Sequence, residues 1–168
     1  MKKKGLLLLG VLAIIMLAVA CPYSSTITLS EPTVKVDKDF YGTWVLQSED
    51  EFPPYYDIKE KDGKVFTLDK YSYNGDTQSY YIEASYEAWF TEIAGTSFVN
   101  VFDITDPATF YLYRLDMKGK ESFVLYEVTD NIDETFTNPK DMVNFFKKYK
   151  DLSFFYNLGE ETYVKAQG

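Results

Sequence analysis

The sequence predicts an all-β fold, an antiparallel meander of eight strands with one helix before the last strand. Turn signals such as Asp62-Gly63, Asn74-Gly75 and Asp106-Pro107 recur at short spacing between apolar or alternating runs, as expected for neighbouring strands joined by hairpins. Residues 39–168 are long enough to form one domain with a core of its own. The expected strands are Gly42–Gln47, Tyr55–Glu60, Lys64–Tyr73, Gln78–Ile93, Ser97–Ile104, Ala108–Met117, Ser122–Thr129 and Glu160–Lys165.

The longest expected strand, Gln78–Ile93, has the clearest alternation. One set of alternate positions is apolar or aromatic, and the other set is mostly polar. Because successive side chains of a strand point to opposite faces, we expect the first set to face a core and the second to face water. The first set is Tyr80, Ile82, Ala84, Tyr86, Ala88 and Phe90, and the second is Glu83, Ser85, Glu87 and Thr91.

A single helix is predicted to follow Asn138, which can cap the free amides of the first turn, and Pro139 suits the first helical position. Asp141 favours the positive end of the helix dipole, and lysines at positions 147, 148 and 150 favour the negative end. The apolar residues recur at helical spacing, so we expect the helix to pack on the outside of the sheet. These residues are Met142, Val143, Phe145, Phe146 and Tyr149.

The first expected strand contains Gly42-Thr43-Trp44, which resembles the G-x-W motif of lipocalins and lipocalin-like (calycin-type) domains. The order of parts is also similar, and small bacterial lipocalin-like lipoproteins look similar around residues 95–101 and 136–163. The resemblance implies an eight-stranded antiparallel up-and-down barrel, with the ring of Trp44 packed across one end. It also implies a basic residue over that ring, and the candidates are Arg114 and Lys165.

The N-terminus is similar to a bacterial lipoprotein signal peptide. Three lysines at positions 2–4 precede an apolar run from Gly5 to Ala20, and Cys21, the only cysteine of the chain, follows directly. The sequence Leu-Ala-Val-Ala-Cys at positions 17–21 resembles the lipobox, whose cysteine is acylated and becomes the new N-terminus. The alternatives are an uncleaved membrane anchor, for which the run is slightly short, and ordinary secretion, since Ala-Val-Ala also fits a general signal peptidase.

This N-terminus predicts three parts and a location. Residues 1–20 are the predicted signal peptide, residues 21–38 the lipidated cysteine with a flexible tether, and residues 39–168 the barrel domain. The alternation of residues 26–29 leaves a short edge strand as the alternative for part of the tether. We therefore expect an exported protein of the cell envelope that is held to a membrane by its lipid anchor. Pro22 is not the acidic residue that some bacteria use for inner-membrane retention, which favours the outer membrane or the cell surface.

The charge of the predicted mature chain excludes nucleic acid as a partner. Three of the 17 basic residues lie in residues 1–20, so 14 basic residues remain beside 26 acidic ones, a net charge of −12. Nucleic-acid binding requires clustered Lys and Arg, and no basic stripe is present. The same charge keeps the domain itself off an anionic lipid surface.

The sequence contains few residues of the types that catalyse reactions in enzymes, and we expect neither catalysis nor a cofactor. The chain has no histidine and one cysteine, and it contains no glycine-rich phosphate loop. Carboxylate runs such as Glu49-Asp50-Glu51 remain as glycosidase or Ca²⁺ candidates, but a solvated acidic loop explains them better. No metal site is predicted.

The aromatic content, with 15 Tyr, 13 Phe and 2 Trp, leaves two functional hypotheses. In the favoured one the rings fill the barrel, and the domain is an interaction or structural module that contacts another envelope protein. In the alternative the barrel is hollow and binds a small apolar or amphipathic ligand. A cavity of a few hundred Å³ would separate the two. The candidate ligand or partner contacts are Tyr55, Tyr56, Tyr80, Tyr81 and Trp89.

Overall fold

A computed structural model describes residues 22–166 of the chain. The predicted signal peptide and Cys21 lie outside the described residues, as do residues 167–168. The described chain is mostly sheet with one α-helix. Within residues 22–166, no helix has the length and apolar character required to cross a membrane.

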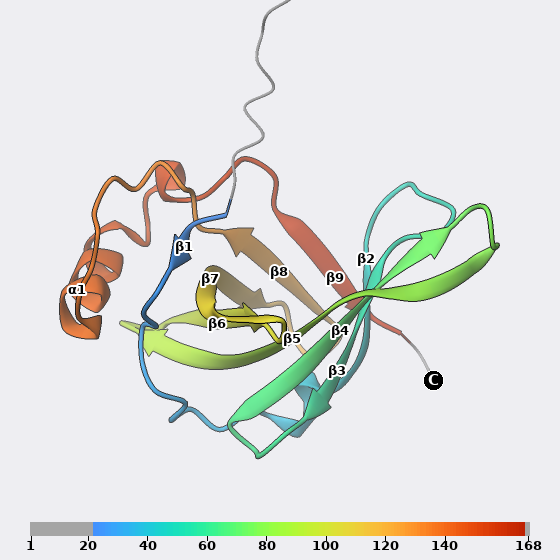
Figure 1. The fold of residues 1–168 in the computed structure, drawn as a ribbon, viewed down its shortest axis with the longest axis horizontal. Helices are drawn as coiled ribbons and strands as arrows, with labels where there is room; N and C mark the ends of the chain where they lie inside the picture. Colours follow the sequence, from blue (N-terminus) through green and yellow to red (C-terminus); the bar gives the residue numbers. More distant parts are fainter. Residues whose placement is uncertain (1–21, 167–168) are drawn as a thin grey trace, which may run out of the picture.

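Eight strands form a closed antiparallel barrel (Figure 1). Each barrel strand pairs with the next one along the chain, and the last strand pairs also with the first, which closes the ring. The predicted eight-stranded barrel with one helix before the last strand is confirmed. Its strands are β2 (Gly42–Leu46), β3 (Tyr55–Glu60), β4 (Val65–Asn74), β5 (Ser79–Ile93), β6 (Thr96–Asp103), β7 (Asp106–Met117), β8 (Ser122–Glu127) and β9 (Glu161–Lys165).

Aromatic rings fill one end of this barrel. Trp44 on β2 is fully buried, and its Nε1 donates a hydrogen bond to the Phe40 carbonyl oxygen (2.8 Å). Phe40 ends the short 3-10 helix η1 (Lys38–Phe40), and its ring centroid lies 5.1–5.9 Å from those of Phe66, Phe90 and Phe123. Ring pairs at this spacing stabilise a core beyond the area that they bury. The barrel is therefore closed by packed rings at this end.

Residues 22–38 pack against the barrel, most of them on its outer surface, which corrects the prediction of a flexible tether for this part. Val36 instead joins the core at the closed end with Phe40 and Trp44. The short strand β1 (Ser24–Ser25) pairs with β7, and Leu29 is 1 % exposed. The Asn100 side chain on β6 holds the segment, because its Oδ1 accepts a hydrogen bond from the Leu29 N–H (2.8 Å). The Trp89 Nε1 donates to the Ser30 carbonyl (2.7 Å). The buried side chain of Leu29 and these two hydrogen bonds hold the segment on the barrel, although its composition is typical of a flexible tether.

A β-bulge changes the faces of the long strand β5. Lys70 pairs with Ala84, whereas Tyr71 pairs with Ile82, so Glu83 is left without a partner in the β4–β5 register. An extra residue reverses the alternation beyond it. Tyr80 and Ile82 therefore lie on the same face as Tyr71, the outer one, and the prediction that they face the core is wrong. They are 37 % and 50 % exposed.

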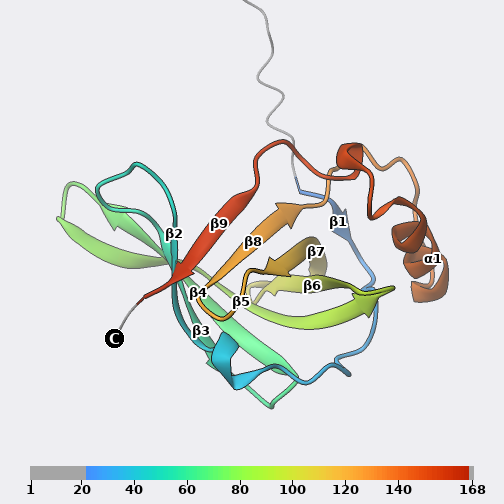
Figure 2. The same cartoon turned by 180° about the vertical axis from the view of Figure 1, so that it is seen from behind.

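The one helix of the described chain, α1 (Pro139–Tyr149), packs on the outside of the barrel, as predicted (Figure 2). The Asn138 side chain accepts a hydrogen bond from the Asp141 N–H (3.0 Å) and so caps the first turn. The buried ring of Phe146 contacts Phe98 of β6 and Phe155 of the 3-10 helix η2 (Ser153–Phe155). This second core, outside the barrel, explains why β6 has the buried apolar residue Phe98 on its outward-facing side.

Candidate ligand-binding site

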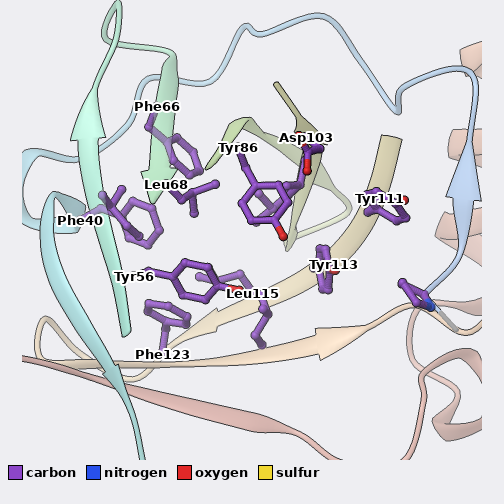
Figure 3. Close-up of a pocket in the computed structure, with 15 residues that line it drawn as sticks. Phe40, Tyr56, Phe66, Leu68, Tyr86, Asp103, Tyr111, Tyr113, Leu115 and Phe123 are labelled. Atoms are coloured by element: carbon purple, nitrogen blue, oxygen red, sulfur yellow. The ribbon is translucent and has the colours of Figure 1, made fainter. Parts of the chain in front are cut away.

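The barrel interior contains a cavity of about 280 Å³ beyond the packed aromatic end. Its walls are mostly apolar and aromatic side chains from β3 to β8, with Pro22, Phe40 and one carboxylate in addition (Figure 3). A volume close to 300 Å³ is at the lower limit of ordinary ligand pockets, so one small molecule fits. The lining residues are Pro22, Phe40, Tyr56, Ile58, Phe66, Leu68, Tyr86, Val99, Val101, Asp103, Tyr111, Tyr113, Leu115, Phe123 and Leu125.

Strand alternation places these side chains in the cavity. On β6 the inward residues are Val99, Val101 and Asp103, and on β7 they are Tyr111, Tyr113 and Leu115. The outward residues Phe98 of β6 and Leu112 of β7 belong to the second apolar core, which also contains Leu29 and the α1 residues Met142 and Phe146. Both faces of these strands are therefore covered, which explains their nearly continuous apolar sequence.

The two ends of the cavity differ in polarity. Figure 3 shows Phe40, Phe66 and Phe123 at one end and Asp103 with Tyr111 at the other. The three phenylalanines are buried, whereas Asp103 and Tyr111 are only half-buried. The cavity therefore has an apolar bottom and a polar opening, an arrangement that suits an amphipathic molecule.

Tyrosine rings supply most of the polar atoms of the cavity wall. Burial, with a smaller contribution from the nearby carboxylate of Glu161, raises the pKa of Tyr56 above its usual value. Burial likewise raises the pKa of Tyr86 and of Tyr113. Behind Tyr56, the Tyr163 hydroxyl donates a hydrogen bond to the Glu161 carboxylate (2.8 Å). At neutral pH the tyrosine hydroxyls are therefore uncharged groups that can donate and accept hydrogen bonds.

Lys165 is the basic residue that covers the tryptophan at the closed end. Its Nζ lies 5.3 Å from the centre of the Trp44 ring, within cation–π distance. A side chain at Gly42 would meet the Lys165 Cε at 3.4 Å, and Gly42 has a φ of +125°, so glycine suits this position on both counts. Arg114, the other candidate, instead lies over the rings of Tyr126 and Tyr156 and forms two hydrogen bonds with Asp116.

Of the five predicted contact residues, the described cavity contains Tyr56 alone. Trp89 faces outward beneath residues 22–38, so its prediction as an entrance residue is wrong. Tyr55 is also on the outer face, stacked on Tyr71 with ring centroids 4.6 Å apart. Tyr80 packs against the edge of Tyr55, and Tyr81 is 48 % exposed at the same end of the β4–β5 hairpin.

Sequence reasoning missed most of the cavity wall. The alternation of its strand predicts that Tyr86 faces the core, but it does not single this tyrosine out as a ligand contact. On β7 the sequence is aromatic or apolar at every position from 110 to 113, so alternation did not decide between Tyr111 with Tyr113 and their outward neighbours. Asp103 could have been found, because it continues the inward series of Val99 and Val101.

The other hollows of the described chain are less suitable for an apolar ligand. Three larger hollows have volumes of about 430, 620 and 830 Å³, and exposed charged side chains such as Lys120 and Glu160 contribute to their walls. Two of them border the interior cavity, one at Phe40 and Leu115 and the other at Tyr113 and Leu125. Among residues 22–166, no group of three or more acidic, histidine or cysteine side chains could hold a metal ion. The apolar interior cavity is therefore the candidate site.

Comparison with known proteins gives no relative for this chain. No protein-family model, no curated protein and no solved structure matches it. The closed eight-stranded barrel with its single late helix is compatible with a lipocalin-like fold.

Proposed function

We propose that this protein is a lipid-anchored protein of the cell envelope, whose lipocalin-like barrel binds a small apolar or amphipathic ligand. The observation that supports binding is the cavity of about 280 Å³ inside the barrel, with its apolar bottom and tyrosine-lined opening. A barrel packed solid with side chains would contain no space of this size. The hollow interior therefore favours the ligand-binding hypothesis over a purely structural module.

The proposed anchor is supported by the N-terminal sequence, a basic start and an apolar run that ends at Cys21. Pro22, the next residue, lines the cavity. The lipid would therefore be attached one residue from the cavity wall, and the ligand could be one that partitions into the same bilayer. Replacing Cys21 with Ala should move the protein from the membrane fraction to the soluble fraction. Retention of this variant in the membrane would contradict the anchor.

Binding is tested by filling the cavity. Val101→Trp adds an indole ring inside the barrel, whereas Val164→Trp adds the same ring at an exposed position of β9. Calorimetric titration with octan-1-ol should show one site on the wild type and on Val164→Trp, and at least about tenfold weaker binding to Val101→Trp. The protein is held in nanodiscs of uncharged digalactosyldiacylglycerol, and empty nanodiscs give the correction for partitioning. Equal affinity in all three proteins would rule out the cavity as the site.

A second function, contact with another envelope protein, is favoured by an exposed aromatic cluster. Phe52 stacks on Tyr73, with ring centroids 4.0 Å apart, and Tyr80 contacts the edge of the Tyr73 ring. Phe52, Tyr80 and the nearby Ile82 are more than one-third exposed. This function predicts that a photo-crosslinker at Ile82 captures one defined envelope protein. The same crosslinker at the exposed Asn144 of α1 should capture none.

A further inference from the structure

Asp103 is the only charged residue among the described residues that line the cavity. It ends β6 at the open end, and β5–β6 pairing places it directly opposite Tyr86. Its Oδ1 accepts two hydrogen bonds, from the Thr105 N–H (2.7 Å) and from the Thr105 hydroxyl (2.6 Å). Within residues 22–166, Oδ2 accepts no hydrogen bond. One oxygen is therefore held by the turn, and the other is available to a ligand.

The carboxylate of Asp103 is charged at neutral pH. The two hydrogen bonds from Thr105 lower the pKa of this group, and they exceed the opposing effect of desolvation. The pKa of Tyr86, on the opposite strand, is raised instead of lowered. Burial is the main cause, and the nearby Asp103 carboxylate raises it further. At neutral pH a negative charge therefore lies beside neutral aromatic rings.

Two of these rings lie at the same end of the cavity as the carboxylate. Figure 3 shows Asp103 close to Tyr86, with Tyr111 also at this end. The face of an aromatic ring attracts a cation, and a carboxylate beside it adds a direct ionic partner. An ammonium group would find both kinds of contact here, whereas a carboxylate or phosphate would meet a like charge.

Other charged groups at this end leave the balance negative. Lys70 is the nearby cation that acts on Tyr86, but its Nζ forms a salt bridge with Glu83 (3.0 Å). Glu127 and Glu161 lie on inward positions of β8 and β9 at the same end, and both help to raise the pKa of Tyr113 after burial. The carboxylates are therefore not cancelled by a free cation, and an anionic head group is disfavoured.

We propose that the ligand is an amine, with an apolar tail in the barrel and a positively charged nitrogen at Asp103 between Tyr86 and Tyr111. This inference rests on the proposed ligand-binding function and names the chemical class that the site selects. The tail would extend from the opening toward Phe40 and Phe66 at the apolar bottom. A primary or quaternary alkylamine fits this description, whereas a fatty acid of equal length does not.

The test compares three ligands of equal chain length, octylamine, octan-1-ol and octanoate, at pH 7 by calorimetry. The full chain is again held in digalactosyldiacylglycerol nanodiscs, whose head groups contain no amine. The wild type should bind octylamine at least about tenfold more tightly than octan-1-ol, and octanoate more weakly than both. Asp103→Asn should reduce the ratio between octylamine and octan-1-ol affinities to less than about threefold.

Asp106→Asn is the matched control, because it removes one negative charge at an exposed position across the same turn, outside the cavity lining. It should keep the octylamine preference, and circular dichroism of each variant checks folding. An octylamine affinity no higher than that of octan-1-ol, or a preference that persists in Asp103→Asn, overturns the amine assignment alone. Failure of all three ligands to bind the wild type overturns the proposed ligand-binding function as well.

Discussion

Asn100 holds residues 22–38 on the barrel, and its replacement with alanine is expected to loosen that segment. The side chain is fully buried on the outward face of β6. Its Oδ1 accepts a hydrogen bond from the Leu29 N–H (2.8 Å), and its Nδ2 donates to the Thr91 Oγ1 (2.9 Å). The Thr91 hydroxyl is in turn 2.6 Å from that of Ser30. The Asn100 amide therefore connects β6 to Leu29 directly, and it connects β6 to Ser30 through the Thr91 hydroxyl on β5.

The expected cost follows from these contacts. Asn100→Ala leaves the buried Leu29 N–H without its acceptor, and an unpaired buried donor costs about 1–3 kcal/mol. Loss of the bond to Thr91 adds about 0.5–1.5 kcal/mol. We expect the free energy of unfolding to fall by about 2–4 kcal/mol, a large part of the roughly 5–15 kcal/mol typical of a domain.

Urea unfolding followed by circular dichroism measures this loss, and digestion with a lysine-specific protease measures its location. Cleavage after the exposed Lys35 should accelerate in Asn100→Ala, because the segment is released more often. Asn144→Ala, at an exposed position of α1, is the control and should change stability by less than about 0.5 kcal/mol. A loss below about 1 kcal/mol in Asn100→Ala, or an unchanged cleavage rate at Lys35, would refute the reasoning.

Three further predictions concern the closed end, the helix and the pH dependence of stability. Trp44→Ala should lower the free energy of unfolding by about 3–5 kcal/mol in urea, because it removes a fully buried ring, and a loss under about 2 kcal/mol would contradict that packing. Asn138→Ala removes the cap of α1 and should lower the free energy of unfolding by about 1 kcal/mol, measured by thermal unfolding. Asn138→Asp should keep most of the wild-type stability, because Asp can also cap a helix. Equal losses in the two variants would argue against the cap. Burial raises the pKa of Tyr156 to about 12, so its neutral form contributes stability that is complete below pH 10 and is lost between pH 10 and 12. Tyr156→Phe should therefore lose less stability than the wild type over that interval, and parallel losses would disprove this assignment.

The sequence determined the elements and their order. Alternating runs between turn residues located all eight barrel strands to within a few residues, and Asn138-Pro139 marked the start of the helix. Trp44 was also found from sequence, and the G-x-W resemblance implied a basic residue over its ring, with Arg114 and Lys165 as the two candidates between which the structure decides for Lys165. These features depend on neighbours in the chain or on a motif, so sequence reasoning could reach them.

The tertiary structure decided which faces are inside and what space remains between them. An unpaired Glu83 in the β4–β5 register moved Tyr80 and Ile82 to the outside, and no local signal marks that bulge. On β7, where both faces are apolar, only closure of the barrel placed Tyr111 and Tyr113 in the cavity. A cavity is the volume left when strands distant in sequence have closed and packed, so it depends on all of them together and not on any single segment.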